Sequence, residues 1–133
     1  MAIIDWYGRY VLGWALSTTL EAQSCVDVLK DCLEQSRCEI FNSDQGSQFT
    51  SEAWIKILTD AKINISMDGR GRYLDNIFVE RLWRTVKQEC IYLQDFQSVA
   101  QAKAVLNNYF IYYNNQRLHQ ALNYRTPAQV YYH

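Results

Sequence analysis

The pattern of apolar and polar positions predicts short strands alternating with amphipathic helices. Aromatic and β-branched residues flank Tyr7-Gly8-Arg9, which is typical of a β-hairpin. Four longer stretches have apolar residues at helical spacing, whereas residues 114–133 are expected to be irregular, with Pro127 starting a short final turn. We expect strands over 2–6, 10–16, 39–42 and 63–66, and helices over 19–35, from Ser51, from Asp75 or Asn76, and from Ser98. This order favours an α/β fold in which helices cover a mixed sheet.

Length and composition indicate one globular domain over residues 1–133. Apolar residues make up 49% of the chain and charged residues 20%, which excludes an intrinsically disordered protein. Charged residues interrupt each apolar run before it reaches membrane-spanning length, and no secretory signal is recognisable at the amino terminus. We therefore expect a cytoplasmic protein that has no membrane partner.

Charge is distributed unevenly between the two halves of the chain. The net charge is −1, which argues against a strongly basic nucleic-acid-binding protein. Residues 1–66 contain five Lys and Arg against nine Asp and Glu, whereas residues 67–133 contain eight against five. A local excess of positive charge can contact phosphate without making the whole domain basic. The basic residues of this patch are Arg70, Arg72, Arg81, Arg84 and Lys87.

The four cysteines do not form a metal-binding pattern. No pair has C-x-x-C spacing, and the chain has only two histidines, so a structural zinc site is not expected. Cys25 and Cys32 lie seven residues apart on a predicted helix, and we expect both thiols to be buried.

Two carboxylates are candidates for a metal site. Asp44 follows a predicted strand, where open α/β sheets place their ligand sites, and Glu80 lies one turn into a helix. Together they could bind Mg²⁺, which supports phosphodiester chemistry. A simpler interpretation stays open for each residue. Asp44 could form an Asx turn before Gly46, and Glu80 could form an exposed i,i+4 pair with Arg84.

The helix that carries Glu80 has two different faces. Polar residues spaced four, four and three positions apart share one face of the helix: Asn76, Glu80, Arg84 and Lys87. Apolar residues occupy the opposite face, which we expect to pack in the core, and they are Val79, Leu82, Trp83 and Val86.

Two longer strings carry a family resemblance. Residues 42–51 read Asn-Ser-Asp-Gln-Gly-Ser-Gln-Phe-Thr-Ser, and residues 75–87 read Asp-Asn-Ile-Phe-Val-Glu-Arg-Leu-Trp-Arg-Thr-Val-Lys. Both closely resemble the DDE transposases of insertion sequences, most of all the insertion-sequence-three group, which are relatives of retroviral integrases. Asp44 and Glu80 have 35 residues between them, as in those families, and Lys87 lies seven residues beyond Glu80, where they place a basic residue. With further matches near both ends, the resemblance covers essentially the whole chain.

The resemblance implies a ribonuclease-H-like (integrase core) fold and metal-dependent cleavage and transfer of DNA strands with Mg²⁺ or Mn²⁺. By this resemblance Asp44 is the second acid of the metal triad, Glu80 is the third, and Lys87 contacts DNA near the active site. His119 matches a family position but has no metal partner nearby in the sequence, so we expect it to be structural. We assign further contacts with DNA to Arg70, Arg72, Asn76 and Arg84; for the arginines, a solvated face is the alternative.

The chain departs from the family near its amino terminus. In the family, the first acid lies on a strand upstream of the stretch that matches residues 2–6, and Asp5 matches a different position. We therefore expect the first strand to be missing, metal binding by Asp44 and Glu80 to be weak, and this polypeptide to be inactive alone. A missing strand would leave two unpaired sheet edges, so we expect either the sheet to close up or a second chain to supply a strand in an intertwined dimer.

Three interpretations of the function remain open at this point. The leading one is a catalytic-core fragment of a transposase that acts on transposon ends and target DNA as a homo-oligomer. The second is a non-enzymatic DNA-binding or oligomerising fragment that modulates an intact transposase. The third is a decayed reading frame without a role.

Overall fold

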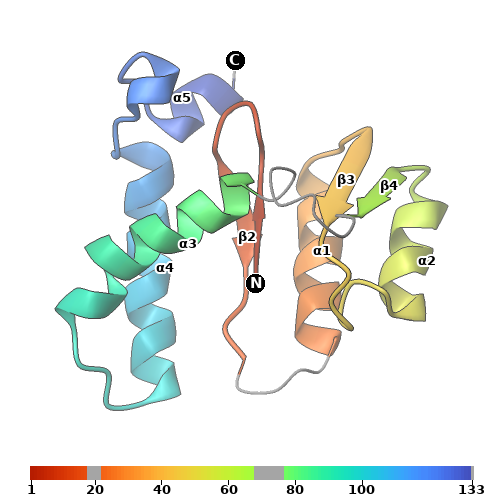
Figure 1. Ribbon diagram of the computed structural model, residues 1–133, viewed down its shortest axis with the longest axis horizontal. Helices are drawn as coiled ribbons and strands as arrows, with labels where there is room; N and C mark the ends of the chain where they lie inside the picture. The colour runs from red at the N-terminus through yellow and green to blue at the C-terminus, as the bar shows by residue number, and fades with distance from the viewer. Residues whose placement is uncertain (18–21, 68–76, 133) are drawn as a thin grey trace. The chain divides into compact units, whose positions relative to one another are not determined.

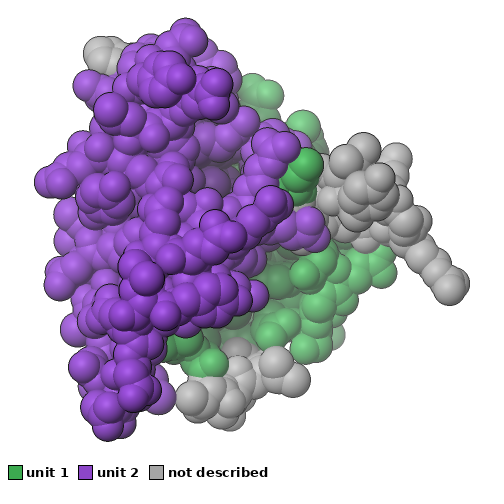
Figure 2. Space-filling model, turned by 60° about the vertical axis from the view of Figure 1, so that its left-hand side comes forward, with its two compact units in different colours: residues 1–3, 13–77 green, residues 4–12, 78–133 purple. Residues whose placement is uncertain are grey.

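The computed structural model describes residues 1–17, 22–67 and 77–132. The chain divides into two compact units, which Figure 2 shows in different colours. Unit 1 comprises residues 1–3 and 13–77, and unit 2 comprises residues 4–12 and 78–133.

The chain begins with the predicted β-hairpin, formed by β1 (Ala2–Ile4) and β2 (Val11–Trp14). Its turn is closed by a hydrogen bond from the Arg9 N–H to the Asp5 carbonyl at 2.8 Å. The Asp5 carboxylate also accepts a hydrogen bond from the Gly8 N–H at 2.6 Å. Arg9 adopts a φ of 61°, a left-handed conformation that is uncommon outside glycine. The hairpin is confirmed, with strands shorter than expected.

Unit 1 combines a parallel pair of strands with two helices. In Figure 1 the two strands lie side by side and α2 runs beside β4. Phe41 of one strand is paired with Ile65 of the other. The elements are α1 (Gln23–Gln35), β3 (Ile40–Ser43), α2 (Glu52–Asp60) and β4 (Asn64–Met67). All four were predicted, and their bounds agree to within a few residues; the predicted start of α1 at residues 19–21 lies outside the described residues.

Trp54 lies at the centre of the core of unit 1. Its side chain is 1% exposed, and the rings of Phe41 and Phe49 meet it edge-on at centroid distances of 5.5 and 5.0 Å. Leu29 of α1 and Leu58 of α2 are fully buried. The helical spacing of these apolar residues explains why α1 and α2 each bury one face.

A close approach between β2 and α1 occurs at a glycine. A Cβ atom at Gly13 would lie 2.7 Å from the Cys32 Sγ atom and 2.8 Å from the Val28 Cγ1 atom, so this position has no room for a side chain. Cys32 and Cys25 are both buried free thiols, as predicted.

Among the residues that the structure describes, the strands form two separate two-stranded sheets, β1–β2 and β3–β4. The mixed α/β class is confirmed, since a hairpin and a parallel pair occur in the same chain. Of the two expected alternatives, closure into a single sheet is not found among these residues, where each pair of strands forms a sheet of its own.

Unit 2 consists of the hairpin tip and the helices of the second half of the chain. Of the four residues of α3 predicted to pack in the core, Leu82 and Val86 are buried, whereas Val79 and Trp83 are only half-buried. Ser98 caps α4 by accepting a hydrogen bond from the Gln101 N–H at 3.1 Å. No helix among the described residues has the length and apolar character needed to cross a membrane. The helices are α3 (Ile77–Glu89), α4 (Val99–Asn115), α5 (Pro127–Tyr131) and two 3₁₀ turns, Ile91–Leu93 and Gln120–Leu122.

The segment after residue 114 is ordered by local hydrogen bonds, so the prediction that it is irregular is wrong. His119 and Arg125 form an antiparallel bridge. Thr126 and Gln129 then form a capping box that starts α5, with Pro127 in its first turn as predicted. Bridges and caps of this kind leave no periodic pattern of apolar residues in the sequence, so hydrophobic periodicity does not predict them.

Candidate functional site

Asp44 follows directly on the carboxyl end of β3 and begins a tight turn. Its Oδ1 atom accepts a hydrogen bond from the Gly46 N–H at 2.7 Å, which forms an Asx turn. The Asp44 side chain is exposed. This hydrogen bond engages one carboxylate oxygen, so the Asx turn leaves the second oxygen able to meet an ion. The two interpretations of Asp44 are therefore compatible.

The neighbouring residues fix the position of this turn. Phe41 precedes Asp44 and Phe49 follows it, and both rings pack against the buried Trp54. In the parallel pairing Ser43 lies opposite Met67, so Asp44 leaves the sheet where β4 also ends. A Cβ atom at Gly46 would lie 2.9 Å from the Asp44 Oδ1 atom, so glycine is required for the turn to close around the carboxylate.

Glu80 lies in the first turn of α3, on the exposed side of the helix. Arg84 and Lys87 are exposed too, whereas Leu82 and Val86 are buried, so the predicted division of the helix into two faces is confirmed. Among the described residues no ion pair joins Glu80 to Arg84, and the simpler interpretation of Glu80 as half of an i,i+4 pair is not supported. An acid in the first turn and Lys87 in the last turn both interact favourably with the helix dipole.

The structure places the predicted site residues in three parts of the chain. Asp44 belongs to unit 1, whereas Glu80, Arg84 and Lys87 belong to unit 2. Arg70, Arg72 and Asn76 lie outside the described residues. Within the described ranges, no three His, Cys, Asp or Glu side chains are grouped closely enough to hold a metal ion.

A network around Glu89 at the end of α3 was not predicted. Arg117 binds the Glu89 carboxylate through two nitrogens, Nε at 3.0 Å and Nη2 at 2.7 Å, and the Tyr109 hydroxyl donates to it at 2.8 Å. The hydrogen bond from Arg117 lowers the pKa of Glu89. Burial and the bond to Glu89 raise the pKa of Tyr109. Glu89 and Arg117 are 28 residues apart, and no spacing in the sequence connects them.

His119 packs as a structural residue would, in agreement with its predicted role. Its ring meets Tyr113 edge-on at 5.0 Å, and its Nε2 atom lies 3.4 Å from an Arg117 nitrogen. Burial, followed by the charge of Arg117, lowers the pKa of His119 to about 4. The imidazole is therefore neutral at pH 7.

Comparisons of the sequence with known families agree with the predicted resemblance. Family models of the integrase core domain match residues 1–72 and 61–127. The transposase for insertion sequence element IS904 of Lactococcus lactis is 30% identical over 132 residues, which cover 93% of this chain and 51% of the relative. The transposase InsF for insertion sequence IS3A of Escherichia coli is 31% identical over 131 residues, which cover 96% and 46%. The chain thus spans about half the length of these relatives.

Solved structures confirm the fold. The HTLV-2 integrase catalytic core domain, in a dimeric form with magnesium, has a TM-score of 0.72 at 16% identity, with 96% of this chain and 79% of that chain covered. The catalytic core domain of BIV integrase has a TM-score of 0.77 at 16% identity, with 98% and 83% covered. These likenesses confirm the ribonuclease-H-like integrase core. Two of the proteins similar to this chain are insertion-sequence transposases. The matched family models show that the chain belongs to the integrase core domain family.

Proposed function

We propose that this chain is the catalytic core of an insertion-sequence transposase and serves the metal-dependent cleavage and transfer of DNA strands. The observation that carries the proposal is the placement of two carboxylates with 35 residues between them: Asp44 at the carboxyl end of β3 and Glu80 on the exposed, basic face of α3. Membership in the integrase core domain family and similarity to transposases support it.

The two carboxylates suit a hard divalent cation. Both side chains are exposed, and carboxylate oxygens are ligands that Mg²⁺ and Mn²⁺ prefer. Asp44 would offer its Oδ2 atom, because Oδ1 accepts the hydrogen bond from Gly46. When bound, the ion would activate a water or hydroxyl and stabilise the leaving oxygen. Binding would be weak, because two carboxylates leave most of the coordination to water.

Basic residues near Glu80 would hold the DNA backbone. Arg84 and Lys87 share the exposed face of α3 with Glu80, one and two turns further along the helix, so they can contact phosphates of a DNA strand held at the carboxylate. We also assign contacts with DNA to Arg70, Arg72 and Asn76, which precede Glu80 closely in the sequence.

These 133 residues by themselves would not cut or join DNA. The family resemblance implies three acids, and this chain supplies two of them, Asp44 and Glu80. Asp5 is a poor candidate for the third, since by the same resemblance it matches a different position of the family, on the strand after the one that carries the first acid. A strand-transfer assay with Mg²⁺ and with Mn²⁺ is expected to yield no product. Robust turnover by the 133-residue polypeptide would contradict this part of the proposal.

Calorimetric titration of Mg²⁺ and Mn²⁺ tests the metal site directly. Four proteins are compared: the wild type, Asp44→Asn, Glu80→Gln and the control Glu34→Gln, which removes an exposed carboxylate from α1. Asparagine at position 44 keeps an acceptor for Gly46, so the turn is retained. We expect binding in the wild type and the control, and its loss in the other two variants. Equal binding in all four proteins would refute the assignment, and DNA binding without enzymatic activity would then be the function to pursue.

We further propose that the chain acts as a homo-oligomer in which a second copy extends a sheet. Each two-stranded sheet has edges that a strand from another chain can extend. The HTLV-2 integrase core, which has the same fold, is described in a dimeric form. Sedimentation velocity over a hundredfold range of protein concentration should show a dimer. A monomer throughout, with unchanged stability on dilution, would contradict this proposal.

A further inference from the structure

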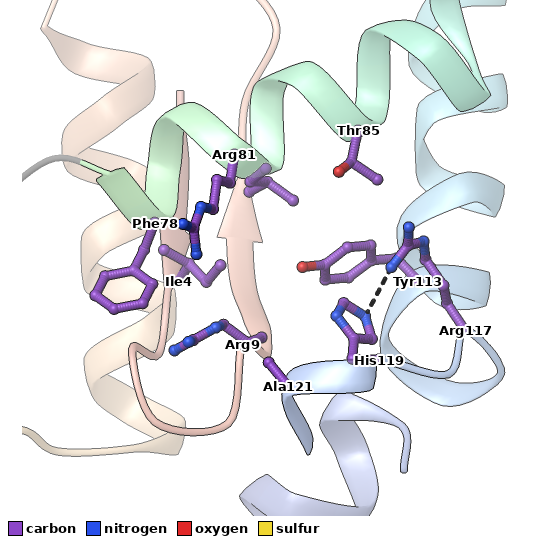
Figure 3. A pocket seen from close by; sticks show the side chains of 10 residues that line it. Ile4, Arg9, Phe78, Arg81, Thr85, Tyr113, Arg117, His119 and Ala121 are labelled. Carbon is purple, nitrogen blue, oxygen red and sulfur yellow. Dashed lines mark hydrogen bonds between the residues drawn. The ribbon is translucent and has the colours of Figure 1, made fainter. Parts of the chain in front are cut away.

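Unit 2 contains a pocket of about 160 Å³ that is lined by three separate segments of the chain. The hairpin tip contributes Arg9, and α3 contributes Arg81 and Thr85; Tyr113, Arg117 and His119 come from α4 and the segment after it. Figure 3 shows Arg9 and Arg81 on one side of the pocket, with Tyr113 and His119 facing them from the other. The Tyr113 hydroxyl is directed between these two sides. Glu80 is not among the lining residues.

The protein neutralises the positive charge of this pocket only in part. Arg117 is paired with the Glu89 carboxylate at 2.7 Å. Among the described residues, neither Arg9 nor Arg81 forms an ion pair, although Asp5 attracts Arg9 from a longer distance. Arg9 and Arg81 also repel each other. Burial first, and then the charge of Arg81, lower the pKa of Arg9. A bound anion would relieve this repulsion.

Arg9 is held in place before any ligand binds. Its guanidinium carbon lies 4.1 Å above the centroid of the Phe78 ring, and its backbone is fixed in the left-handed region by the hairpin turn. Stacking uses the face of a guanidinium group and leaves the N–H donors along its edge free to bind an anion. The side chain therefore loses little conformational freedom on binding.

We propose that this pocket binds a phosphate group, held by the guanidinium groups of Arg9 and Arg81 and by the hydroxyls of Thr85 and Tyr113. The donors face the pocket from several directions. A tetrahedral phosphate presents oxygens in all of these directions, whereas a carboxylate presents two oxygens in one plane. Arginine is also the side chain best suited to bidentate phosphate binding. The phosphate comes either from a DNA backbone or from free inorganic phosphate, and only the first source rests on the function proposed above.

Titration with inorganic phosphate, followed by NMR at constant ionic strength with chloride as the reference anion, tests the site. The wild type should show saturable shifts at His119 and Tyr113, and the pKa of His119 should rise from about 4 because a nearby phosphate favours the imidazolium. Arg81→Gln should weaken binding about tenfold, through the loss of a charge-assisted hydrogen bond. Arg9→Lys keeps the charge but loses the planar group, and should weaken binding less.

The control variant is Lys103→Gln, which removes an exposed positive charge from the same unit. Lys103 lies ten residues before Tyr113 on α4, about 15 Å along the helix axis. This variant should bind phosphate like the wild type, and circular dichroism should show all the variants folded. The absence of saturable shifts in the wild type, or wild-type binding by Arg81→Gln, would overturn the proposal.

A second titration with a short DNA duplex distinguishes the two sources of phosphate. If inorganic phosphate competes with the duplex and Arg81→Gln weakens DNA binding, the pocket takes a backbone phosphate. If inorganic phosphate binds in the pocket and DNA binding is unchanged in Arg81→Gln, the source is free phosphate. Both results support the pocket. A chain that binds phosphate but no DNA at all would refute the transposase proposal and leave the pocket intact.

Discussion

The side-chain amide of Asn114 in α4 makes two hydrogen bonds to the backbone of one residue, Val11 in β2. Its Oδ1 atom accepts from the Val11 N–H at 2.8 Å, and its Nδ2 group donates to the Val11 carbonyl at 2.9 Å. Both residues are buried, so the amide takes the place of a neighbouring strand as the partner of this backbone. The pair joins the hairpin tip to α4 within unit 2, across 103 residues of sequence.

Replacing Asn114 with alanine should strongly destabilise unit 2. The change leaves a buried N–H and a buried carbonyl without partners, and we expect the free energy of unfolding to fall by about 2–4 kcal/mol. Urea denaturation measures this loss. Asn108→Ala on the same helix is the control, because Asn108 is exposed and its replacement should change stability by less than about 0.5 kcal/mol. Equal effects of the two variants would show that the Val11 bonds contribute little.

Alanine at position 13 should disturb the contact between β2 and α1. Its Cβ atom would approach the Cys32 Sγ atom to 2.7 Å, and relieving this overlap should cost about 1–3 kcal/mol of stability. Removing the sulfur provides the control. The Gly13→Ala/Cys32→Ala double variant should lose less stability than the sum of the losses in the two single variants, because removing the sulfur makes room for the new methyl group. Strict additivity in thermal or urea unfolding would contradict this account.

Replacing Gly46 with alanine should weaken metal binding although it removes no metal ligand. The added methyl carbon would lie 2.9 Å from the Asp44 Oδ1 atom, so the carboxylate must shift. We expect the affinity for Mn²⁺, measured by calorimetry, to fall about tenfold, as for other changes next to metal ligands. Gly8→Ala is a matched control, since it crowds the Asp5 carboxylate in a similar way at 3.0 Å. Metal affinity that falls equally in both variants would point to a general loss of structure.

Neutralising Lys87 should weaken DNA binding to a similar degree for all sequences. An exposed lysine that contacts one phosphate contributes through counterion release, so Lys87→Gln should reduce the slope of log affinity against log salt by about 1. Fluorescence anisotropy with a labelled duplex at several salt concentrations measures this slope. Lys103→Gln, which removes an exposed charge from α4, should leave the slope unchanged. The same slope in the wild type and Lys87→Gln would exclude the phosphate contact.

Stability should fall in two stages as the pH is lowered. The folded protein keeps His119 neutral down to a pKa of about 4, whereas the unfolded chain takes up this proton near 6.5. The contribution of His119 is thus complete above pH 6.5 and is lost between 6.5 and 4; for a half-exposed ring we expect about 1–2 kcal/mol. The hydrogen bond from Arg117 lowers the pKa of Glu89 below its ordinary value of 4.5. The contribution of Glu89 to stability is therefore complete above pH 4.5 and is lost as the pH falls below that value.

Two variants separate these stages. His119→Gln should flatten the stability profile between pH 6.5 and 4, as measured by urea denaturation at half-unit intervals. Glu89→Gln should keep a loss of stability between pH 6.5 and 4, because the charge of Glu89 raises the pKa of His119 and its removal does not oppose the lowered pKa, and should reduce the further loss below pH 4.5. A wild-type slope in His119→Gln between pH 6.5 and 4 would assign the first stage to another group.

Short-range features of this protein were predictable from sequence. The caps at Ser51 and Ser98 and the two faces of α3 depend on residues within one or two helical turns, so spacing alone identified them. The candidate acids Asp44 and Glu80 were likewise found from short strings and the interval between them. The order of strands and helices predicted the α/β class, because each element forms from its own local pattern.

Contacts between distant segments depended on the tertiary structure. The sequence contains no pattern that pairs Glu89 with Arg117, joins Asn114 to Val11, or stacks Arg9 on Phe78. These contacts form because buried apolar faces, such as that of α3 with Leu82 and Val86, bring separate segments together, and the polar side chains that they carry then find partners. The pairing of the strands into two sheets is decided in the same way, since a strand's own residues determine its faces but not its neighbour.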